Sequence, residues 1–552
     1  MSFKHGEMAI QELGSQQYKN RDDEDMAKFG RKQRFERNFG FLSMLGFTTT
    51  MMCTWEAVLT YVKTYIIKSY GADHEYSANP AAMTDGGPAT LVYGFIFCWI
   101  GALLTAASLA EMASMAPTSA GQYHWVSMLA PKGQAVFLSW VTGWLDMIGW
   151  WANTASGVYF AATVLQGLLV LNYDGYDFQR WHGTLLMFAA LVICLLVNSV
   201  GARILPKIEG LILILHTAGF LAILIPLVYL APHKNAKFVF ANFTNTSGWK
   251  NSGLTWLIGL MGTNLPFIGY DGPCHMSEEV VNASVIVPWC MIATIMLNGI
   301  LGFAMVLAFL FCVGDLDAAL DSATGYDFIE VFFNATKSHA GTSVMTAIVI
   351  ALTICASFGF LASSSRLTWA LAKDKGIPFA DFLSHISTAT SGSALPLRAI
   401  ALCAIITAIT CLINIGSSAA FNAMISLTTA GLFSSYEIAI VLMLIKKLKN
   451  EPLPYGPWTL GRRWGILINI GSICFLTITI FFSFFPEELP VTPTNMNWSI
   501  VVFMGEFLLG LGWYLVRGRK IYNGPVMDVP VAVPVGGESV MGGDRDGDGV
   551  DD

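Results

Sequence analysis

A run of helix-breaking residues interrupts an apolar segment that is long enough to cross a membrane. The segment extends over residues 253–281, and its interior holds Pro266, Gly269, Asp271, Gly272 and Pro273. In lipid every backbone N–H and C=O needs a hydrogen-bond partner, so unwound chain at that depth must face protein, water or a ligand. Free N–H groups at the start of a half-helix suit a carboxylate, and free carbonyls at the end of one suit an ammonium. The break at residues 267–271 therefore predicts a binding site near the middle of the bilayer.

A second weak point lies in the first apolar segment, residues 40–66. There Gly46 is followed closely by three threonines. Threonine hydroxyls can bond backbone carbonyls within a helix, or they can bond a ligand. A simple kink and close helix packing are the alternative explanations of the two patterns. Two breaks together could grip a solute that carries both charges. The predicted substrate-binding residues are Thr48, Thr49, Thr50, Met51, Phe267, Ile268, Gly269, Tyr270 and Asp271.

The composition is that of an integral membrane protein. Hydrophobic residues make up 54% of the 552 residues and charged residues 12%, whereas soluble domains carry about 25% charged residues. The 16 Trp and 36 Phe suit lipid-facing surfaces and membrane interfaces. No basic stripe carries interleaved aromatics, so the sequence predicts no nucleic-acid partner. The partner that it predicts is the lipid bilayer.

The sequence carries no catalytic or metal-binding motif. Its ten cysteines are scattered through apolar segments, without a Cys-x-x-Cys pair or a His/Cys ligand spacing. We therefore expect buried thiols, and neither a disulfide framework nor a metal site. The sequence has no His-Glu-x-x-His and no Gly-x-x-x-x-Gly-Lys-Ser/Thr. We predict no enzyme activity and no cofactor.

Twelve segments are long and apolar enough to span a bilayer, which takes about 20 residues. They predict an all-α polytopic membrane protein with about 12 transmembrane helices, whose transmembrane domain covers residues 40–516. The segments lie at residues 40–66, 90–114, 135–171, 184–200, 208–230, 253–281, 285–313, 341–369, 396–415, 419–444, 464–485 and 497–516.

Lysine and arginine predict the orientation of these segments. With the N-terminus inside, 24 of the 31 Lys and Arg residues fall in segments that face the cytoplasm. An even number of spans then places the C-terminus inside as well. Residues 1–39 are polar and lack the apolar core of a signal peptide, so we expect a disordered cytoplasmic tail. We expect residues 517–552 to form a second cytoplasmic tail, disordered over its Gly-, Val- and Asp-rich end.

Five motifs resemble those of the fungal amino-acid/choline permeases, a group that includes 4-aminobutyrate-type permeases of the amino acid–polyamine–organocation superfamily. The sixth segment reads FIGYD at residues 267–271, followed by HMSEE at 275–279. The other four motifs are SLAEMASMAPTSAGQY at 108–123, SSSRLTWALAKDKGIP at 363–378, GPWTLG at 456–461 and LPVTPTNMNW at 489–498. The similarity covers about residues 40–525.

The resemblance implies a fold of two inverted five-helix repeats, with broken helices 1 and 6 and two additional helices. The two interrupted segments are the first and the sixth, which is the spacing that such repeats produce. The resemblance also implies secondary uptake of an amino acid, 4-aminobutyrate or a choline-like amine, with the proton as coupling ion. We expect the plasma membrane as the location, with the vacuolar membrane as the alternative.

Three charged or titratable residues lie in or beside the predicted spans. His216 matches the position where proton-coupled relatives carry a lysine in place of a sodium ion, so it is a candidate for proton coupling; the alternative is a packing histidine. Glu111 ends the second span, where it could take part in proton coupling or in a gating or structural ion pair. For Asp146 in the third span we expect structural pairing.

Two departures from the resembling family stand out. Residues 63–83 have the character of an insertion of about twenty residues, which is either an external loop or an error in the gene model. At Val287-Pro288-Trp289 relatives commonly carry an arginine after the proline. The loop around Glu278 and Glu279 is thereby left without a base nearby in the sequence.

Two alternative functions remain open. A permease for choline or another quaternary amine needs an aromatic cage, which Trp150, Trp151, Phe267 and Tyr270 could supply. A nutrient sensor would keep the binding site but would not transport. We favour an amino acid as substrate because the threonine-rich first break supplies polar hydrogen-bonding groups.

Overall fold

The computed structural model describes residues 21–60, 85–314, 322–388, 394–416, 419–492 and 496–526. The insertion predicted at residues 63–83 and the far ends of both tails lie outside these ranges. Within them the chain is mainly helical, because long apolar segments can satisfy their backbone hydrogen bonds in lipid only as helices.

Ten helices of the described chain are long and apolar enough to cross a membrane. Nine of the twelve predicted segments correspond to α5 (Gly87–Met115), α7 (Ala135–Asn172), α8 (Arg180–Ser199), α9 (Leu205–Leu230), α13 (Ala283–Cys312), α16 (His339–Lys373), α18 (Leu397–Gly416), α19 (Ala419–Leu448) and α20 (Gly461–Phe482). The last segment continues from α21 (Ser499–Trp513) through a π-helix, η3 (Tyr514–Gly518), into α22 (Arg519–Ile521).

The first and sixth predicted segments are divided into shorter helices. The first consists of α2 (Phe41–Met52) and α3 (Thr54–Thr60), and the sixth of α11 (Ser252–Asn264), the 3₁₀ turn η1 (Leu265–Phe267) and α12 (Gly272–His275). With these two interrupted segments, all twelve predicted spans have a counterpart in the structure. The prediction of an all-α polytopic protein is confirmed.

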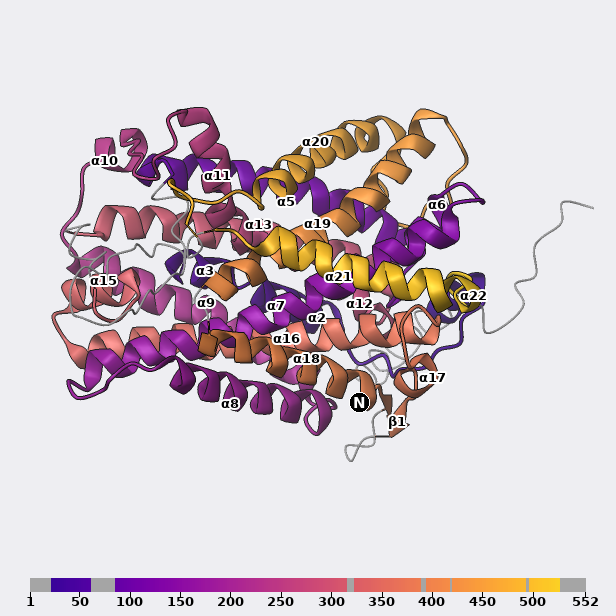
Figure 1. Cartoon of the computed structure of the whole chain (residues 1–552), viewed down its shortest axis with the longest axis horizontal. Helices are drawn as coiled ribbons and strands as arrows, with labels where there is room; N and C mark the ends of the chain where they lie inside the picture. Colours follow the sequence, from indigo (N-terminus) through magenta and orange to yellow (C-terminus); the bar gives the residue numbers. More distant parts are fainter. Residues whose placement is uncertain are drawn as a thin grey trace, which may run out of the picture.

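The long helices lie side by side along the horizontal axis of Figure 1. The central helix α7 packs against α16 and α19, α5 packs against α13, and α2 packs against α9. Short elements occupy the two ends of the bundle. At the left are α10 (Ala236–Ala241) and α15 (Asp327–Thr336), and at the right are α6 (Gln122–Leu129), α17 (Ala380–Leu383) and α22. We call the right-hand end the terminal face, because the C-terminal helix α22 lies there; the Lys and Arg count predicts that it is cytoplasmic.

The terminal face also carries the only sheet that the described residues form. Strands β1 (Ser387–Thr388) and β2 (Ala394–Leu395) pair antiparallel between α17 and α18. The 3₁₀ turn η2 (Ser277–Glu279) follows α12 and connects it to α13.

Part of the predicted N-terminal tail packs against the protein instead of being disordered. Met26, Phe35 and Phe39 are buried, and the backbone N–H of Asn38 and that of Phe39 donate to the carbonyl of Glu279. The expectation for residues 1–39 rested on polar composition, which hides these apolar side chains spaced between charges. At the other end Tyr522 is buried, so residues up to 526 also pack on the terminal face.

Candidate functional site

The predicted break in the sixth span is confirmed. Helix α11 ends at Asn264, η1 makes one tight turn, and the chain then runs without helical structure from Ile268 to Asp271 before α12 begins. Gly269 has a φ of +100°, a conformation that only glycine adopts without strain. Proline occupies the first turn of both η1 and α12, where its missing N–H leaves no broken hydrogen bond.

The break in the first span lies later than the sequence suggested. Residues 48–51 belong to helix α2, which ends at Met52, and the interruption is Cys53, with a left-handed φ of +50°. The hydroxyl of Thr48 donates to the Met44 carbonyl one turn earlier, so this threonine supports the helix. Gly46 serves close packing, because a Cβ atom there would lie 2.4 Å from the Glu209 carbonyl oxygen of α9.

Side chains from other helices satisfy the carbonyls that the two breaks expose. The hydroxyl of Thr54, at the start of α3, donates to the Pro266 carbonyl at 2.7 Å and so joins the two breaks directly. Asn298 on α13 donates to the Thr49 carbonyl at 2.9 Å. Ser363 on α16 donates to the Gly272 carbonyl at 3.3 Å. The unwound segments are thus held by protein, as the absence of water in lipid demands.

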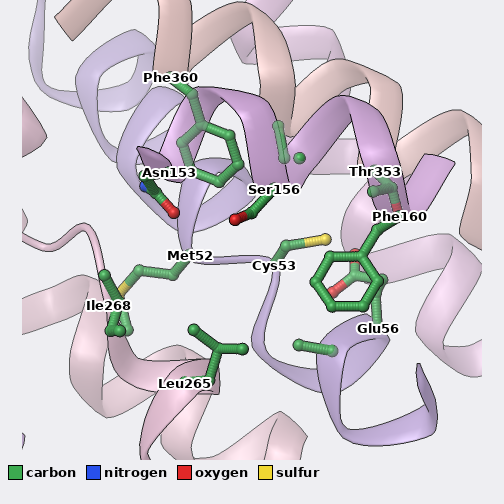
Figure 2. A pocket seen from close by; sticks show the side chains of 13 residues that line it. Met52, Cys53, Glu56, Asn153, Ser156, Phe160, Leu265, Ile268, Thr353 and Phe360 are labelled. Atoms are coloured by element: carbon green, nitrogen blue, oxygen red, sulfur yellow. The ribbon is translucent and has the colours of Figure 1, made fainter. Parts of the chain in front are cut away.

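A small cavity of about 50 Å³ lies between the two breaks (Figure 2). It has room for a few water molecules, so a larger solute requires the lining side chains to move. Four polar residues and a larger number of apolar ones form its wall. The lining residues are Met52, Cys53, Glu56, Ala57, Asn153, Ser156, Gly157, Phe160, Leu265, Ile268, Thr353, Ala356 and Phe360.

Glu56 and Asn153 give the cavity opposite hydrogen-bonding groups. Glu56, on α3, is 1% exposed, and its Oε2 has no nitrogen or hydroxyl donor among the described residues. Asn153, on α7, is 6% exposed, and its Nδ2 likewise lacks an acceptor within the described chain. A buried polar group without a partner is costly. The pair therefore offers a carboxylate oxygen and an amide donor to whatever enters the cavity.

His216 holds Glu56 from behind the cavity. Its Nδ1 lies 2.8 Å from Glu56 Oε1, and its Nε2 lies 3.2 Å from Asn298 Oδ1. Because Asn298 also donates to the carbonyl of Thr49, the chain of contacts runs from the end of α2 through α13 and α9 to α3. The imidazole therefore positions the carboxylate that faces the cavity.

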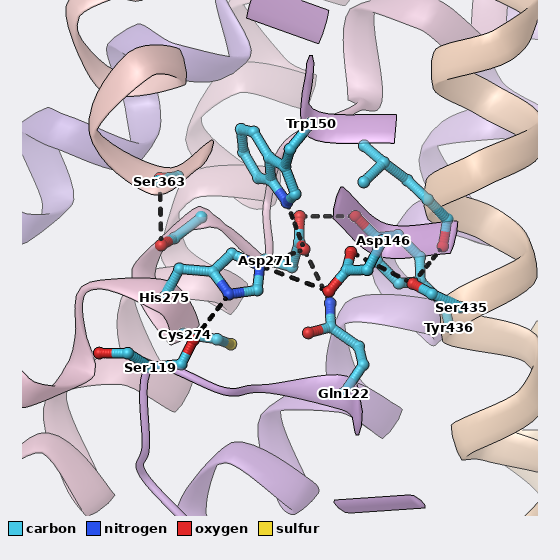
Figure 3. Close-up of polar contacts among 12 residues, drawn as sticks. Ser119, Gln122, Asp146, Trp150, Asp271, Cys274, His275, Ser363, Ser435 and Tyr436 are labelled. Carbon is cyan, nitrogen blue, oxygen red and sulfur yellow. Dashed lines mark hydrogen bonds and ion pairs between the residues drawn. The ribbon is translucent and has the colours of Figure 1, made fainter. Parts of the chain in front are cut away.

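Asp271 is the centre of a second buried polar group (Figure 3). Its Oδ2 accepts hydrogen bonds from Gln122 Nε2 at 2.7 Å and Trp150 Nε1 at 3.2 Å, and its Oδ1 accepts one from the Tyr436 hydroxyl at 2.5 Å. His275 Nε2 lies 3.3 Å from the same Oδ2. Residues of α6, α7 and α19 thus converge on the last residue of the sixth-span break.

The chain's relatives agree with this architecture. A model of the amino acid permease family matches residues 39–505. The chain belongs to the amino acid permease family. It is 30% identical over 467 residues to an amino-acid permease of Arabidopsis thaliana, an alignment that covers 80% of this chain and 88% of the relative.

Fungal relatives are similar to the permease over comparable lengths. A choline transporter of Saccharomyces cerevisiae is 30% identical over 450 residues, which is 80% of this chain and 78% of the relative. An amino-acid permease of Neurospora crassa is 28% identical over 517 residues, 92% of this chain and 90% of the relative. The permease is therefore a multi-pass membrane transporter of small molecules and not an enzyme.

The remaining predicted substrate-binding residues lie around the cavity rather than on it. Of the nine, only Ile268 is part of the wall of the permease's cavity. Phe267 packs on Phe95 with ring centroids 4.8 Å apart, and Tyr270 packs on Tyr436 at 5.6 Å. The side chain of Thr49 contacts that of Thr294, 3.4 Å away on α13. Met51 fills the space beside Gly272, where a Cβ atom would lie 1.9 Å from its Cε. Thr50 is buried within α2.

Glu111 forms a structural ion pair in the permease. It pairs with Lys447 at the end of α19, and both side chains are fully buried. Its other oxygen accepts hydrogen bonds from the Thr459 hydroxyl at 3.0 Å and the Leu460 N–H at 2.9 Å. These contacts tie α5 to the connection between α19 and α20. Of the two uses that the sequence left open, the geometry favours the structural one.

The acidic loop after α12 does have basic partners, which come from distant parts of the chain. Arg366 on α16 pairs with Glu279 at 2.8 Å, and Arg31 of the N-terminal segment lies 3.8 Å from Glu278 and 3.0 Å from Asp374. Burial alone would lower the pKa of Arg31, but the negative charges of Asp374 and Glu278 outweigh it and raise that pKa above its usual range. The expectation of a loop without bases looked only at sequence neighbours and was wrong.

Glu56 and Asn153 were missed by sequence reasoning. Glu56 did carry a usable signal, since it is an acid inside a predicted span and such residues are expensive in lipid. Asn153 had none, because its role arises only from the packing of α7 against the two breaks. Gln122, His275 and Tyr436 were missed for the same reason.

Proposed function

We propose that this permease is a secondary active transporter that imports an amino acid or a related small amine together with a proton. The observation that carries the proposal is the cavity between the two interrupted helices, where Glu56 Oε2 has no nitrogen or hydroxyl donor and Asn153 Nδ2 has no acceptor within the described chain. A carboxylate suits an ammonium group, and an amide N–H suits a carboxylate. A substrate with both groups satisfies the two orphaned atoms at once.

The surroundings of the cavity favour an amino acid over a quaternary amine. A quaternary ammonium has no N–H, so its cationic group cannot donate a hydrogen bond to Glu56 Oε2. Recognition by an aromatic cage needs rings around the cation, but the cavity wall contains only Phe160 and Phe360 as aromatic residues. Choline remains the alternative substrate, because one relative is named a choline transporter.

Proton symport is part of the same proposal. His216 remains a candidate for coupling, since its imidazole lies 2.8 Å from the carboxylate of the cavity. We place the permease in the plasma membrane, with the terminal face in the cytoplasm as the Lys and Arg distribution predicts. The vacuolar membrane is the alternative location.

The test is radiolabelled uptake into proteoliposomes that contain the purified permease. A panel of amino acids, 4-aminobutyrate and choline is offered with an inward pH gradient, with and without a protonophore. We expect one or more amino acids to accumulate, and the protonophore to abolish the accumulation. Accumulation of choline alone would refute the assignment to amino acids.

Counterflow separates a transporter from a nutrient sensor. In this assay, unlabelled substrate inside the vesicle drives entry of labelled substrate by exchange, without a net driving force. A sensor would bind the substrate and show no exchange, whereas the proposed function requires exchange. Binding without exchange would therefore refute it.

A further inference from the structure

Three buried titratable residues meet on the terminal-face side of the sixth-span break. They are Asp271, the residue just before α12, His275 at the end of α12, and Asp146 on α7. All three are fully buried. His275 Nε2 lies 3.3 Å from Asp271 Oδ2 and 3.7 Å from Asp146 Oδ2 (Figure 3). We call these three residues the acid–histidine triad.

Hydrogen bonding determines which imidazole nitrogen can titrate. His275 Nδ1 lies 3.2 Å from the backbone carbonyl of Ser119. A carbonyl can only accept a hydrogen bond, so Nδ1 carries a hydrogen in both charge states. Nε2 instead faces two carboxylate oxygens. Proton gain or loss by His275 therefore takes place at Nε2.

The two carboxylates differ in how well they are satisfied. Asp271 accepts three hydrogen bonds, from Gln122, Trp150 and Tyr436. Among the residues that the structure describes, Asp146 accepts a hydrogen bond only from the Ser435 hydroxyl, at 3.3 Å to Oδ1. Its Oδ2 is buried with no hydrogen-bond partner among the described residues, and it is directed at His275 Nε2. A hydrogen bond is therefore missing between Asp146 Oδ2 and His275 Nε2.

We propose that the acid–histidine triad binds the coupling proton, between Asp146 Oδ2 and His275 Nε2. The proposal rests on the proposed function of proton symport and names the site of the coupling ion. Binding one proton lowers the negative charge of the triad by one unit and supplies the missing hydrogen bond. The carboxylates of Asp146 and Asp271 are too close to each other, in a water-poor environment, for both to remain ionised easily, so the site favours binding of a proton.

The donors around Asp271 favour a proton over a metal ion. The ligand atoms of the triad lie within 4.8 Å of one another, a spacing that could admit a cation. However, the hydrogens of Gln122, Trp150 and Tyr436 already occupy three of the about four lone-pair sites of the Asp271 carboxylate. A metal ion needs these lone pairs, and the indole of Trp150 cannot act as a ligand. The geometry is that of a hydrogen-bonded network.

The triad connects a short half-helix to the long helices around it. Asp271 caps α12 and His275 ends it, whereas Asp146 lies on α7. Ser435 and Tyr436 lie on α19. Loss of the proton leaves two facing carboxylates with one hydrogen fewer between them. The repulsion weakens the attachment of α12 to α7 and α19. Proton release and movement of the half-helix are thereby linked.

No other charged side chain of the described residues contacts the triad. The groups that face it from the surrounding elements are polar, neutral or paired elsewhere. They are Tyr436 and Ser435 from α19, Gln122 from α6, Trp150 from α7, Cys274 of α12 against Met291 of α13, Ser363 of α16 bonded to Gly272, and, farther along α16, Arg366 paired with Glu279.

The test compares Asp146→Asn and His275→Gln with wild type in proteoliposomes that contain the full chain. In a one-to-one symport, a pH gradient of one unit supports an accumulation of about tenfold. We expect wild type to approach this limit, and both variants to equilibrate substrate with about onefold accumulation while still catalysing counterflow. Counterflow should depend on pH in wild type and lose that dependence in Asp146→Asn.

A control variant and two further arms make the result decisive. Glu209→Gln removes another buried carboxyl, one that lies on α9 outside the triad, and should accumulate substrate like wild type. His216→Gln tests the other buried histidine. The monomer peak and melting temperature of each variant show whether it is folded. A sodium gradient replaces the pH gradient in the last arm.

The outcomes separate the site from the function. Asp146→Asn and His275→Gln that accumulate substrate like wild type would overturn the triad as the proton site and leave symport standing. If His216→Gln is the only variant that loses accumulation, the triad is likewise overturned as the proton site. A wild type driven by sodium and not by protons would refute proton coupling, and a wild type without counterflow would refute transport itself.

Discussion

Replacing Glu56 by glutamine tests the substrate site most directly. The substitution keeps the size of the side chain and removes its charge. Glu56 is 1% exposed, so bulk solvent does not screen its charge, and its Oε1 already bonds His216 at 2.8 Å. The free Oε2 is therefore the atom available to an ammonium group of the substrate.

The size of the effect follows from the burial. Removing one member of a buried charge pair costs about 2–5 kcal/mol, and about 1.4 kcal/mol corresponds to a tenfold change in affinity. We expect Glu56→Gln to weaken apparent substrate affinity by roughly 30-fold to 3,000-fold. A rise in the counterflow KM, or a loss of radioligand binding to purified protein, measures it.

Glu209→Gln serves as the matched control. Glu209 is a buried carboxyl on the neighbouring α9, and it does not line the cavity. Its replacement should leave the KM within about twofold of wild type. A Glu56→Gln permease with unchanged KM, or a Glu209→Gln permease with the same loss, would refute the assignment of the ammonium site to Glu56.

Four further predictions concern the breaks and the buried charges. Gly269→Leu should abolish uptake while the protein still reaches the membrane. A left-handed φ of +100° strains a leucine by about 1–3 kcal/mol, and the added side chain contacts Trp150. Full uptake in transport assays would contradict the site. His216→Ala removes the group that holds Glu56, so if the triad binds the proton, accumulation and exchange should fall equally; a selective loss of pH-driven accumulation would instead assign coupling to His216. Lys447→Met should destabilise the protein by about 3–5 kcal/mol by orphaning Glu111, and the double variant with Glu111→Gln should recover most of the melting temperature. Arg31→Gln, which leaves Asp374 and Glu278 unpaired, should favour opening of the terminal face, measured as faster labelling of engineered cysteines there.

The twelve spans could be predicted because each is a local property of the chain. About 20 apolar residues in a row can lie in lipid only as a helix. The break at residues 267–271 was equally local, since Pro266 removes an N–H and Gly269 permits a positive φ. These features need no knowledge of neighbouring helices.

The first break shows where local reasoning fails. The glycine and threonines at residues 46–50 predicted an interruption of the helix there, yet these residues are helical. Gly46 packs against α9, and the Thr48 hydroxyl donates a hydrogen bond within its own helix. Cys53 is no helix breaker by type. It is the interruption because Thr54 bonds Pro266 and Asn298 bonds the carbonyl of Thr49, and both partners come from distant segments.

The packed N-terminal segment has the same cause. Its composition is polar, and only the presence of Asp374 and Glu278 on the terminal face gives Arg31 its buried place. Charges that look solvated in the sequence find partners more than two hundred residues away.

The sequence by itself determined the fold class, the number of spans and the position of one interruption, because these follow from hydrogen bonding and hydrophobicity over twenty neighbouring residues. Only the tertiary structure decided which polar atoms face the cavity, and which acids stand beside His275. Glu56 and Asn153 become a site, and Asp146 and Asp271 become a triad with His275, through the packing of helices that are far apart in the chain. Coulomb and hydrogen-bond energies depend on distances of a few ångströms, and those distances exist only once the helices have packed.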